Sequence, residues 1–159
     1  MDALLYRFSL LQQIFMDQIQ ILERLAGRWE GPEMLISQNV EAVTSIDTRV
    51  AMGNKFMMSD HTQRRLDGST FFNHLVYAWY EESQQYAFFQ FDSTGRLPTT
   101  PTYGQWTGQQ LVFEKSTPAL ALRFIYDFPD ANNYQFTLQH SHTVDQWENV
   151  VVGRFHRLS

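Results

Sequence analysis

Apolar residues recur at spacings of three and four over the first 26 residues of the chain. Polar residues such as Gln12, Asp17 and Glu23 fall on the opposite side of a helix with this spacing. The pattern predicts one amphipathic helix over 1–26, ended by Gly27, because glycine readily adopts the left-handed conformation common at helix C-termini. The apolar stripe consists of Leu4, Leu5, Phe8, Leu11, Ile14, Phe15, Ile19, Ile21, Leu22 and Leu25.

After Gly27 the chain changes to short alternating runs rich in Val, Thr, Phe and Tyr, separated by Gly, Asn, Asp, Pro and Ser. Successive strands without crossover helices favour an antiparallel up-and-down sheet, which usually closes into a barrel and so removes its exposed edges. We therefore expect an all-β fold in a single domain, 1–159, with the helix over 1–26 and the barrel over 27–159.

The barrel segment divides into about ten strands. Tight turns are expected at 52–55, 66–69 and 107–109, and the one long irregular connection at 95–102. The predicted strands span 28–36, 41–52, 55–66, 69–80, 86–94, 102–107, 110–117, 119–128, 134–144 and 147–158.

Composition and charge narrow the classes of function. The 12 Lys and Arg residues against 17 Asp and Glu give a formal net charge of -5, so we expect no basic surface for nucleic acid. The absence of Cys excludes disulfides, thiolate metal sites and a Cys nucleophile. Polar interruptions at Arg7, Gln12 and Gln13 argue against a signal peptide or a membrane span, so we expect a cytoplasmic protein.

One pair of polar residues could carry chemistry inside the barrel. If 81–85 is a five-residue connection, antiparallel pairing places His74 opposite Asp92, and Val76 opposite Gln90. Opposed side chains have Cβ atoms about 4.5–5.5 Å apart, close enough for the carboxylate to orient the imidazole. The pair could act as a general acid or base, anchor a polar ligand, or simply satisfy itself and fix the strand register.

The apolar faces of the last three strands select a register in which His142 faces Asn149 and His140 faces Val151. The expected interior then grades from aromatic at one end to polar at the other. Such a cavity suits a small amphipathic ligand, although aromatic side chains could also simply fill a small barrel. The predicted inward set is Leu120, Leu122, Phe124, Tyr126, Phe128, Tyr134, Phe136, Leu138, His140, His142, Trp147, Asn149, Val151, Gly153 and Phe155.

Three stretches of the sequence resemble a known family. Leu25-Ala-Gly27-Arg-Trp29-Glu-Gly31 resembles the G-x-W-x-G opening of lipocalin-like, or calycin-like, barrels. His74-Leu-Val-Tyr-Ala-Trp79 and Phe91-Asp92-Ser93-Thr94-Gly95 are similar to the H-x-V-x-G-W and W-D-S-x-G signatures of a bacterial calycin-like family of unknown function. This sequence has Ala78 and Phe91 where that family usually has glycine and tryptophan. The resemblance implies a lipocalin-like barrel and carries no established activity.

No cofactor and no metal are expected. The related heme-binding nitrobindin barrels continue with a glycine-rich stretch and place a histidine ligand in the last strand. Here Pro32 follows Gly31, and Asn149 lies near the position of that histidine, so the resemblance does not imply heme. His140 and His142 point the same way on a strand, but the predicted register offers them no third metal ligand. Serine-hydrolase, phosphate-loop and dinucleotide motifs are absent from the sequence.

The strands at 69–80 and 86–94 carry bulky apolar residues on both faces, which leaves open the face that points inward. Something should cover the outer face, and a helix over 1–26 is longer than the mouth of a small barrel requires. We therefore expect either that this helix lies along the outer wall or that the chain forms a homodimer.

These observations leave three functional hypotheses. The first is a non-enzymatic barrel that binds a small, largely apolar or amphipathic ligand. The second is an enzyme that uses His74 with Asp92 for proton transfer in the same cavity, and the third is a filled barrel that acts as a protein-interaction module. The first is favoured over an enzyme. Its predicted ligand contacts are Trp29, His74, Gln90, Asp92, Phe124, Tyr126, Phe136, His140, His142, Trp147 and Asn149.

Overall fold

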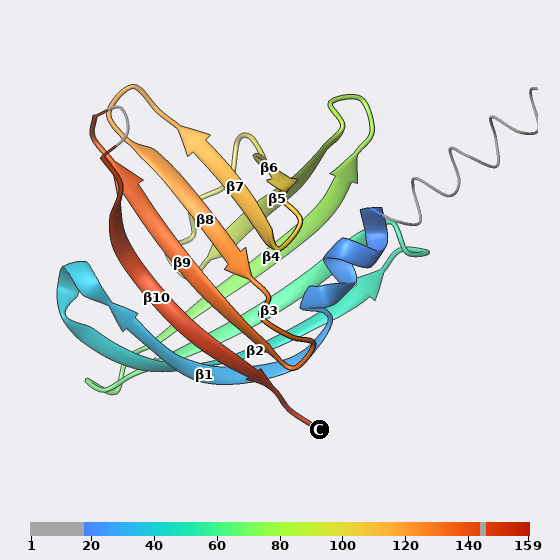
Figure 1. Ribbon diagram of the computed structural model, residues 1–159. Coiled ribbons are helices and arrows are strands. Elements are labelled where there is room, and N and C mark those ends of the chain that lie inside the picture. Colours follow the sequence, from blue (N-terminus) through green and yellow to red (C-terminus); the bar gives the residue numbers. More distant parts are fainter. Residues whose placement is uncertain (1–17, 144–145) are drawn as a thin grey trace, which may run out of the picture.

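A computed structural model describes residues 18–143 and 146–159, which form a closed antiparallel barrel of ten strands (Figure 1). Each strand pairs with its sequence neighbours, and β1 closes the barrel against β10, so the predicted up-and-down barrel is confirmed. The strands are β1 (Gly27–Leu35), β2 (Val40–Ala51), β3 (Phe56–Arg65), β4 (Thr70–Tyr80), β5 (Gln85–Asp92), β6 (Thr102–Trp106), β7 (Gln110–Ser116), β8 (Ala121–Asp127), β9 (Asn133–Ser141) and β10 (Glu148–Arg157).

A short helix precedes β1 and lies at one end of the barrel (Figure 1). Residues 18–22 are α-helical and continue into the 3-10 turn η1 (Glu23–Leu25). Gly27 follows with a φ of 116°, which confirms the predicted end of the helix near this glycine. The part of the predicted helix over 1–17 lies outside the described residues. Within the described part of the chain, no helix has the length and apolar character needed to cross a membrane.

The two strands that close the barrel approach each other closely at Gly31. A Cβ atom at this position would lie 1.8 Å from the backbone oxygen of Arg154 in β10. Any side chain there would push β1 away from β10, so closure of the barrel requires glycine. The close contact between β1 and β10 therefore explains why the last residue of the G-x-W-x-G stretch is glycine.

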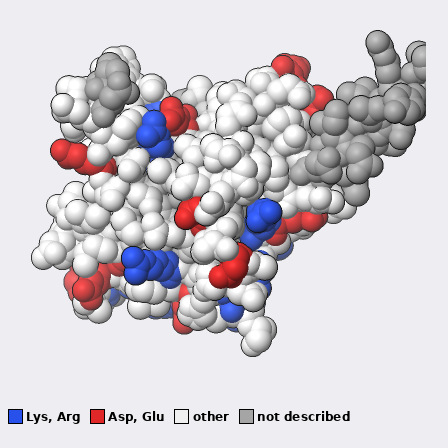
Figure 2. Space-filling model, in the orientation of Figure 1, with Lys and Arg blue, Asp and Glu red and all other residues white. Residues whose placement is uncertain are grey.

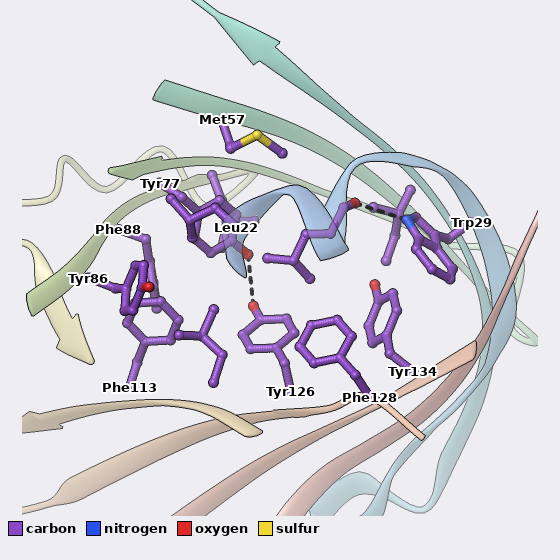
Figure 3. Close-up of a cluster of buried hydrophobic side chains, with 14 of the residues drawn as sticks. Leu22, Trp29, Met57, Tyr77, Tyr86, Phe88, Phe113, Tyr126, Phe128 and Tyr134 are labelled. Carbon is purple, nitrogen blue, oxygen red and sulfur yellow. Dashed lines mark hydrogen bonds between the residues drawn. The ribbon is translucent and has the colours of Figure 1, made fainter. Parts of the chain in front are cut away.

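The end of the barrel beside the helix is filled by hydrophobic side chains (Figure 3). Leu22 and Leu25 of the helix insert among the aromatic rings of the strands, and both are buried. The helix is held by Trp29, whose Nε1 donates a 2.9 Å hydrogen bond to the backbone oxygen of Leu25. The helix thus plugs this end. The aromatic part of the core consists of Trp29, Tyr77, Tyr86, Phe88, Phe113, Tyr126, Phe128, Tyr134 and Phe155.

Strand direction places the remaining connections. Because neighbouring strands are antiparallel, the connections after β1, β3, β5, β7 and β9 lie at the end opposite the helix. The connection after β1 contains the short turn η2 (Ile36–Gln38), and the connection after β5, residues 93–101, is the long irregular loop that the sequence predicted. This opposite end is called the open end below.

The outer surface carries charges of both signs and some exposed aromatic residues. On the face shown in Figure 2, Lys and Arg side chains are interspersed with Asp and Glu, with wide uncharged areas between them. Elsewhere on the wall, β4 and β5 turn Phe72, Phe89 and Phe91 outward. The inner faces of β4 and β5 carry the buried residues Leu75, Tyr77, Tyr86 and Phe88, which settles the face that the sequence left open.

Candidate functional site

A cavity of about 190 Å³ lies inside the barrel toward the open end. Its walls include residues from the open-end halves of the strands, such as Leu35, Arg65 and Leu138, whereas the helix and its core fill the other half. The interior is therefore partly filled and partly hollow.

The two walls of this cavity differ in chemistry. Strands β1 to β5 are neighbours in the barrel and supply every charged, amide, imidazole and threonine side chain that lines it. The opposite wall, β8 to β10, contributes only aromatic and aliphatic residues. The polar wall consists of Glu33, Thr44, His61, Gln63, Arg65, Asn73 and Gln90, set among Leu35, Ile46, Phe71 and Leu75 of the same strands, and the apolar wall of Phe124, Tyr126, Tyr134, Phe136, Leu138, Val151 and Phe155.

A carboxyl group anchors the polar wall. Glu33 is 8% exposed, and its Oε2 accepts hydrogen bonds from Thr44 Oγ1 at 2.5 Å and from Gln63 Nε2 at 2.6 Å. Arg65 Nε in turn donates to Gln63 Oε1 at 3.1 Å, so the amide links the guanidinium to the carboxylate. Room for Glu33 comes from Gly153, where a Cβ would lie 2.9 Å from Glu33 Cγ. The network offsets the cost of placing a carboxylate in the wall.

A neutral imidazole sits beside this network. His61 Nε2 is 2.8 Å from Ser59 Oγ, which is itself 2.6 Å from Thr48 Oγ1. Desolvation by the surrounding wall lowers the pKa of His61 to about 4, so the ring is neutral at pH 7. A neutral imidazole has one N–H donor and one acceptor nitrogen, so it can hydrogen-bond a ligand of either kind.

The predicted pairing of His74 with Asp92 is wrong. The structure pairs Asn73 with Asp92 and His74 with Phe91. The reason is the length of the connection between β4 and β5, which holds four residues, 81–84, where the prediction assumed five. This one-residue difference turns His74 to the outer face of the barrel.

On the outer face His74 has a different acidic partner. Its Nδ1 lies 2.6 Å from Asp60 Oδ1, and Arg49 Nη1 donates to Asp60 Oδ2 at 2.7 Å. Both contacts lower the pKa of Asp60, the hydrogen bond from Arg49 contributing most. The proposed acid–base pair in the cavity is thereby overturned, and with it the basis of the enzyme hypothesis.

The predicted register of the last two strands is also wrong. Val151 pairs with Leu138, two residues from its predicted partner His140, and an irregularity between Asn149 and Val151 then pairs Glu148 with His140 and Asn149 with Gln139. Asn149 consequently lies on the outer face, where its Oδ1 accepts a 2.9 Å hydrogen bond from Gln139 Nε2. This irregularity is a β-bulge, and the sequence pattern does not predict it.

The histidines and tryptophans of the predicted site lie outside the cavity. His140 Nε2 is 3.2 Å from Glu148 Oε2 at the open end, and the ring of the exposed His142 lies beside it, tilted by 60°, with ring centroids 5.0 Å apart. Trp147 lies 3.9 Å beneath the guanidinium of Arg123, and Trp29 belongs to the packed end. No group of three or more His, Cys, Asp or Glu in the described ranges is placed to hold a metal ion.

Four predicted contacts do line the cavity, namely Gln90, Phe124, Tyr126 and Phe136. Sequence reasoning missed most of the polar wall. A usable signal was the alternation in β3, where polar residues follow the buried Met57 at every second position. The missed residues are Glu33, Thr44, His61, Gln63, Arg65 and Asn73.

Solved structures place this architecture in a broad class. The chain is similar to the crystal structure of Rv2717c from M. tuberculosis, with a TM-score of 0.64, 16% identity, and 89% and 97% of the two chains covered. It is also similar to the S-type phycobiliprotein lyase CPES from Guillardia theta, with a TM-score of 0.63, 12% identity, and 88% and 92% covered. At these identities the likeness establishes the fold, a lipocalin-like barrel.

The family follows from the sequence itself. The model of the family described as "Protein of unknown function (DUF1579)" matches residues 16–157, and the chain belongs to this family. No curated protein matches the sequence. The expected membership in a barrel family without an established activity is therefore confirmed.

Proposed function

We propose that this protein binds a small amphipathic ligand in the cavity at the open end of the barrel. The observation that supports this proposal is the division of the cavity into a polar wall on β1 to β5 and an apolar wall on β8 to β10. A ligand with one hydrogen-bonding edge and one apolar face satisfies both walls at once. A purely apolar ligand would cover the remaining donors and acceptors of the polar wall without pairing them and would bind less well.

The cavity volume sets the size of the buried part of the ligand. An apolar protein cavity of about 150 Å³ binds benzene. The present cavity of about 190 Å³ has room for one aromatic ring with a polar substituent, or for a short branched chain. The rest of a larger ligand would extend through the open end.

The polar wall offers hydrogen bonds in both directions. Gln90 Nε2 donates to Asn73 Oδ1 at 2.8 Å, which leaves Gln90 Oε1 as an acceptor and Asn73 Nδ2 as a donor. His61 adds a ring nitrogen beside them. These uncharged groups favour a polar edge such as an amide, hydroxyl or ring nitrogen.

A matched pair of variants on β10 tests the location. Val151 lines the cavity, and its neighbour Val152 points to the outer face. Val151→Trp should fill the cavity and weaken binding of the neutral probe N-phenyl-1-naphthylamine at least about tenfold, or about 1.4 kcal/mol. Val152→Trp adds the same indole outside and should change the dissociation constant less than about twofold.

Fluorescence titration measures both constants, and circular dichroism establishes that each variant is folded. Leu138→Trp, on the same apolar wall, provides an independent filling variant. Unchanged binding of the probe in both filling variants would contradict the proposal, because the probe would then bind elsewhere, such as on the exposed aromatic residues of β4 and β5.

We also propose that the chain assembles as a homodimer through the outer faces of β4 and β5. Phe72 is 53% exposed there, and Phe91 is 40% exposed, which is unusual for large apolar side chains on one wall. Light scattering after size-exclusion chromatography should give twice the monomer mass, and Phe72→Ser should lower it. A monomer mass at all protein concentrations would refute this assembly.

A further inference from the structure

A second hollow adjoins the cavity at the open end. A groove of about 380 Å³ runs between the loop 93–101 and the ends of β5, β7 and β8. It shares two wall residues, Gln90 and Phe124, with the cavity. These two side chains therefore stand where the cavity and the groove adjoin.

Two cationic side chains line this groove. Lys115 follows the buried residues Leu111 and Phe113 at alternate positions of β7, so strand geometry directs it to the inner face at the rim. Arg96 reaches the groove from the loop 93–101. Neither side chain forms an ion pair or hydrogen bond with another residue in 18–143 or 146–159.

The acidic residue of the groove is engaged in the loop. Asp92 Oδ1 accepts hydrogen bonds from the backbone N–H of Thr94, at 2.9 Å, and from the Thr94 hydroxyl, which fixes the carboxylate in the turn after β5. The cavity and groove together then hold three Lys and Arg side chains against two Asp and Glu. The chain as a whole has the opposite balance, 12 against 17. The lining of the cavity and groove is thus slightly cationic, in contrast to the chain as a whole.

We propose that the groove is a second subsite, which holds an anionic group of the ligand whose apolar part lies in the cavity. The chemical class is a carboxylate, sulfonate or phosphate attached to a small apolar body. This inference rests on the proposed function, since the cavity must hold that apolar body. Lys115 and Arg96 would bind the anion by charge-assisted hydrogen bonds, and Phe124 would contact the apolar part at the junction.

Two probes separate the subsites. 1-Anilinonaphthalene-8-sulfonate and N-phenyl-1-naphthylamine share one ring system, and only the first carries a sulfonate. Lys115→Met and Arg96→Met should each weaken binding of the sulfonate about three- to fivefold, as expected for partly solvated ion pairs. Each should change binding of the neutral probe less than about twofold. Added salt should likewise weaken binding of the sulfonate alone.

The control removes the same charge at the other end of the barrel. Lys55 lies in the turn between β2 and β3, at the helix end, so Lys55→Met should leave both dissociation constants unchanged. If the neutral probe binds in the cavity but neither rim variant weakens the sulfonate relative to Lys55→Met, the anionic subsite is overturned and the proposed function stands. If neither Val151→Trp nor Leu138→Trp affects either probe, the anionic subsite and the proposed ligand-binding function both fall.

Discussion

The hydrogen bond from Thr44 to Glu33 gives a quantitative test of the polar wall. Thr44 is 2% exposed, and its Oγ1 lies 2.5 Å from a carboxylate oxygen that is itself in an 8% exposed residue. Thr44→Val keeps the shape of the side chain and removes the donor. A hydrogen bond to a charged group contributes about 1.5–3 kcal/mol to stability. Since Gln63 remains as a second donor, we expect a loss of about 2 kcal/mol.

Urea unfolding followed by tryptophan fluorescence measures this loss, and calorimetry should show a melting temperature lower by about 4–8 °C. Thr137→Val is the control, because Thr137 is 8% exposed and its hydroxyl accepts only a long contact of 3.5 Å from Gln135. It should cost less than about 0.5 kcal/mol. If the two variants lost the same free energy of unfolding, the hydroxyl of Thr44 would not be what holds the Glu33 carboxylate in the wall.

Two further predictions concern His61 and Trp29. The pKa of His61 falls from 6.5 to about 4 on folding, so the unfolded chain binds more protons between these values. The free energy of unfolding of the wild type should therefore fall by up to about 3 kcal/mol as the pH falls through this window. In urea unfolding measured at several pH values, His61→Gln should lack this part of the pH dependence. If the wild type and the variant lost stability in parallel, burial of His61 would not be the source of the pH dependence. Trp29→Phe removes the hydrogen bond to Leu25 and should lower the free energy of unfolding by about 1–2 kcal/mol in the same assay. The control is Trp147→Phe, because Trp147 is half-buried. An equal or smaller loss for Trp29→Phe would show that this hydrogen bond does not hold the helix.

The strands and the barrel could be predicted because alternation and turn residues are local signals. All ten predicted strands occur, with ends displaced by a few residues. The helix end at Gly27 was equally readable, since a positive φ favours glycine.

The site could be predicted only in part because it depends on register. One residue fewer in the connection 81–84 moved His74 outside and placed Asn73 in the cavity wall. The bulge between Asn149 and Val151 moved Asn149 outside. The first change was not readable from the hydrophobic pattern, because β4 and β5 are apolar on both faces. The aromatic wall residues Phe124, Tyr126 and Phe136 were predicted correctly, because inward and outward residues alternate regularly in the strands that carry them.

The most direct test of the proposed cavity is a two-dimensional NMR titration of isotopically labelled protein with N-phenyl-1-naphthylamine. The account predicts that the largest amide shifts fall on residues whose side chains line the cavity, such as His61, Asn73 and Phe136, with saturation at one probe per chain. Shifts confined to the outer faces of β4 and β5, around Phe72 and Phe91, would contradict it.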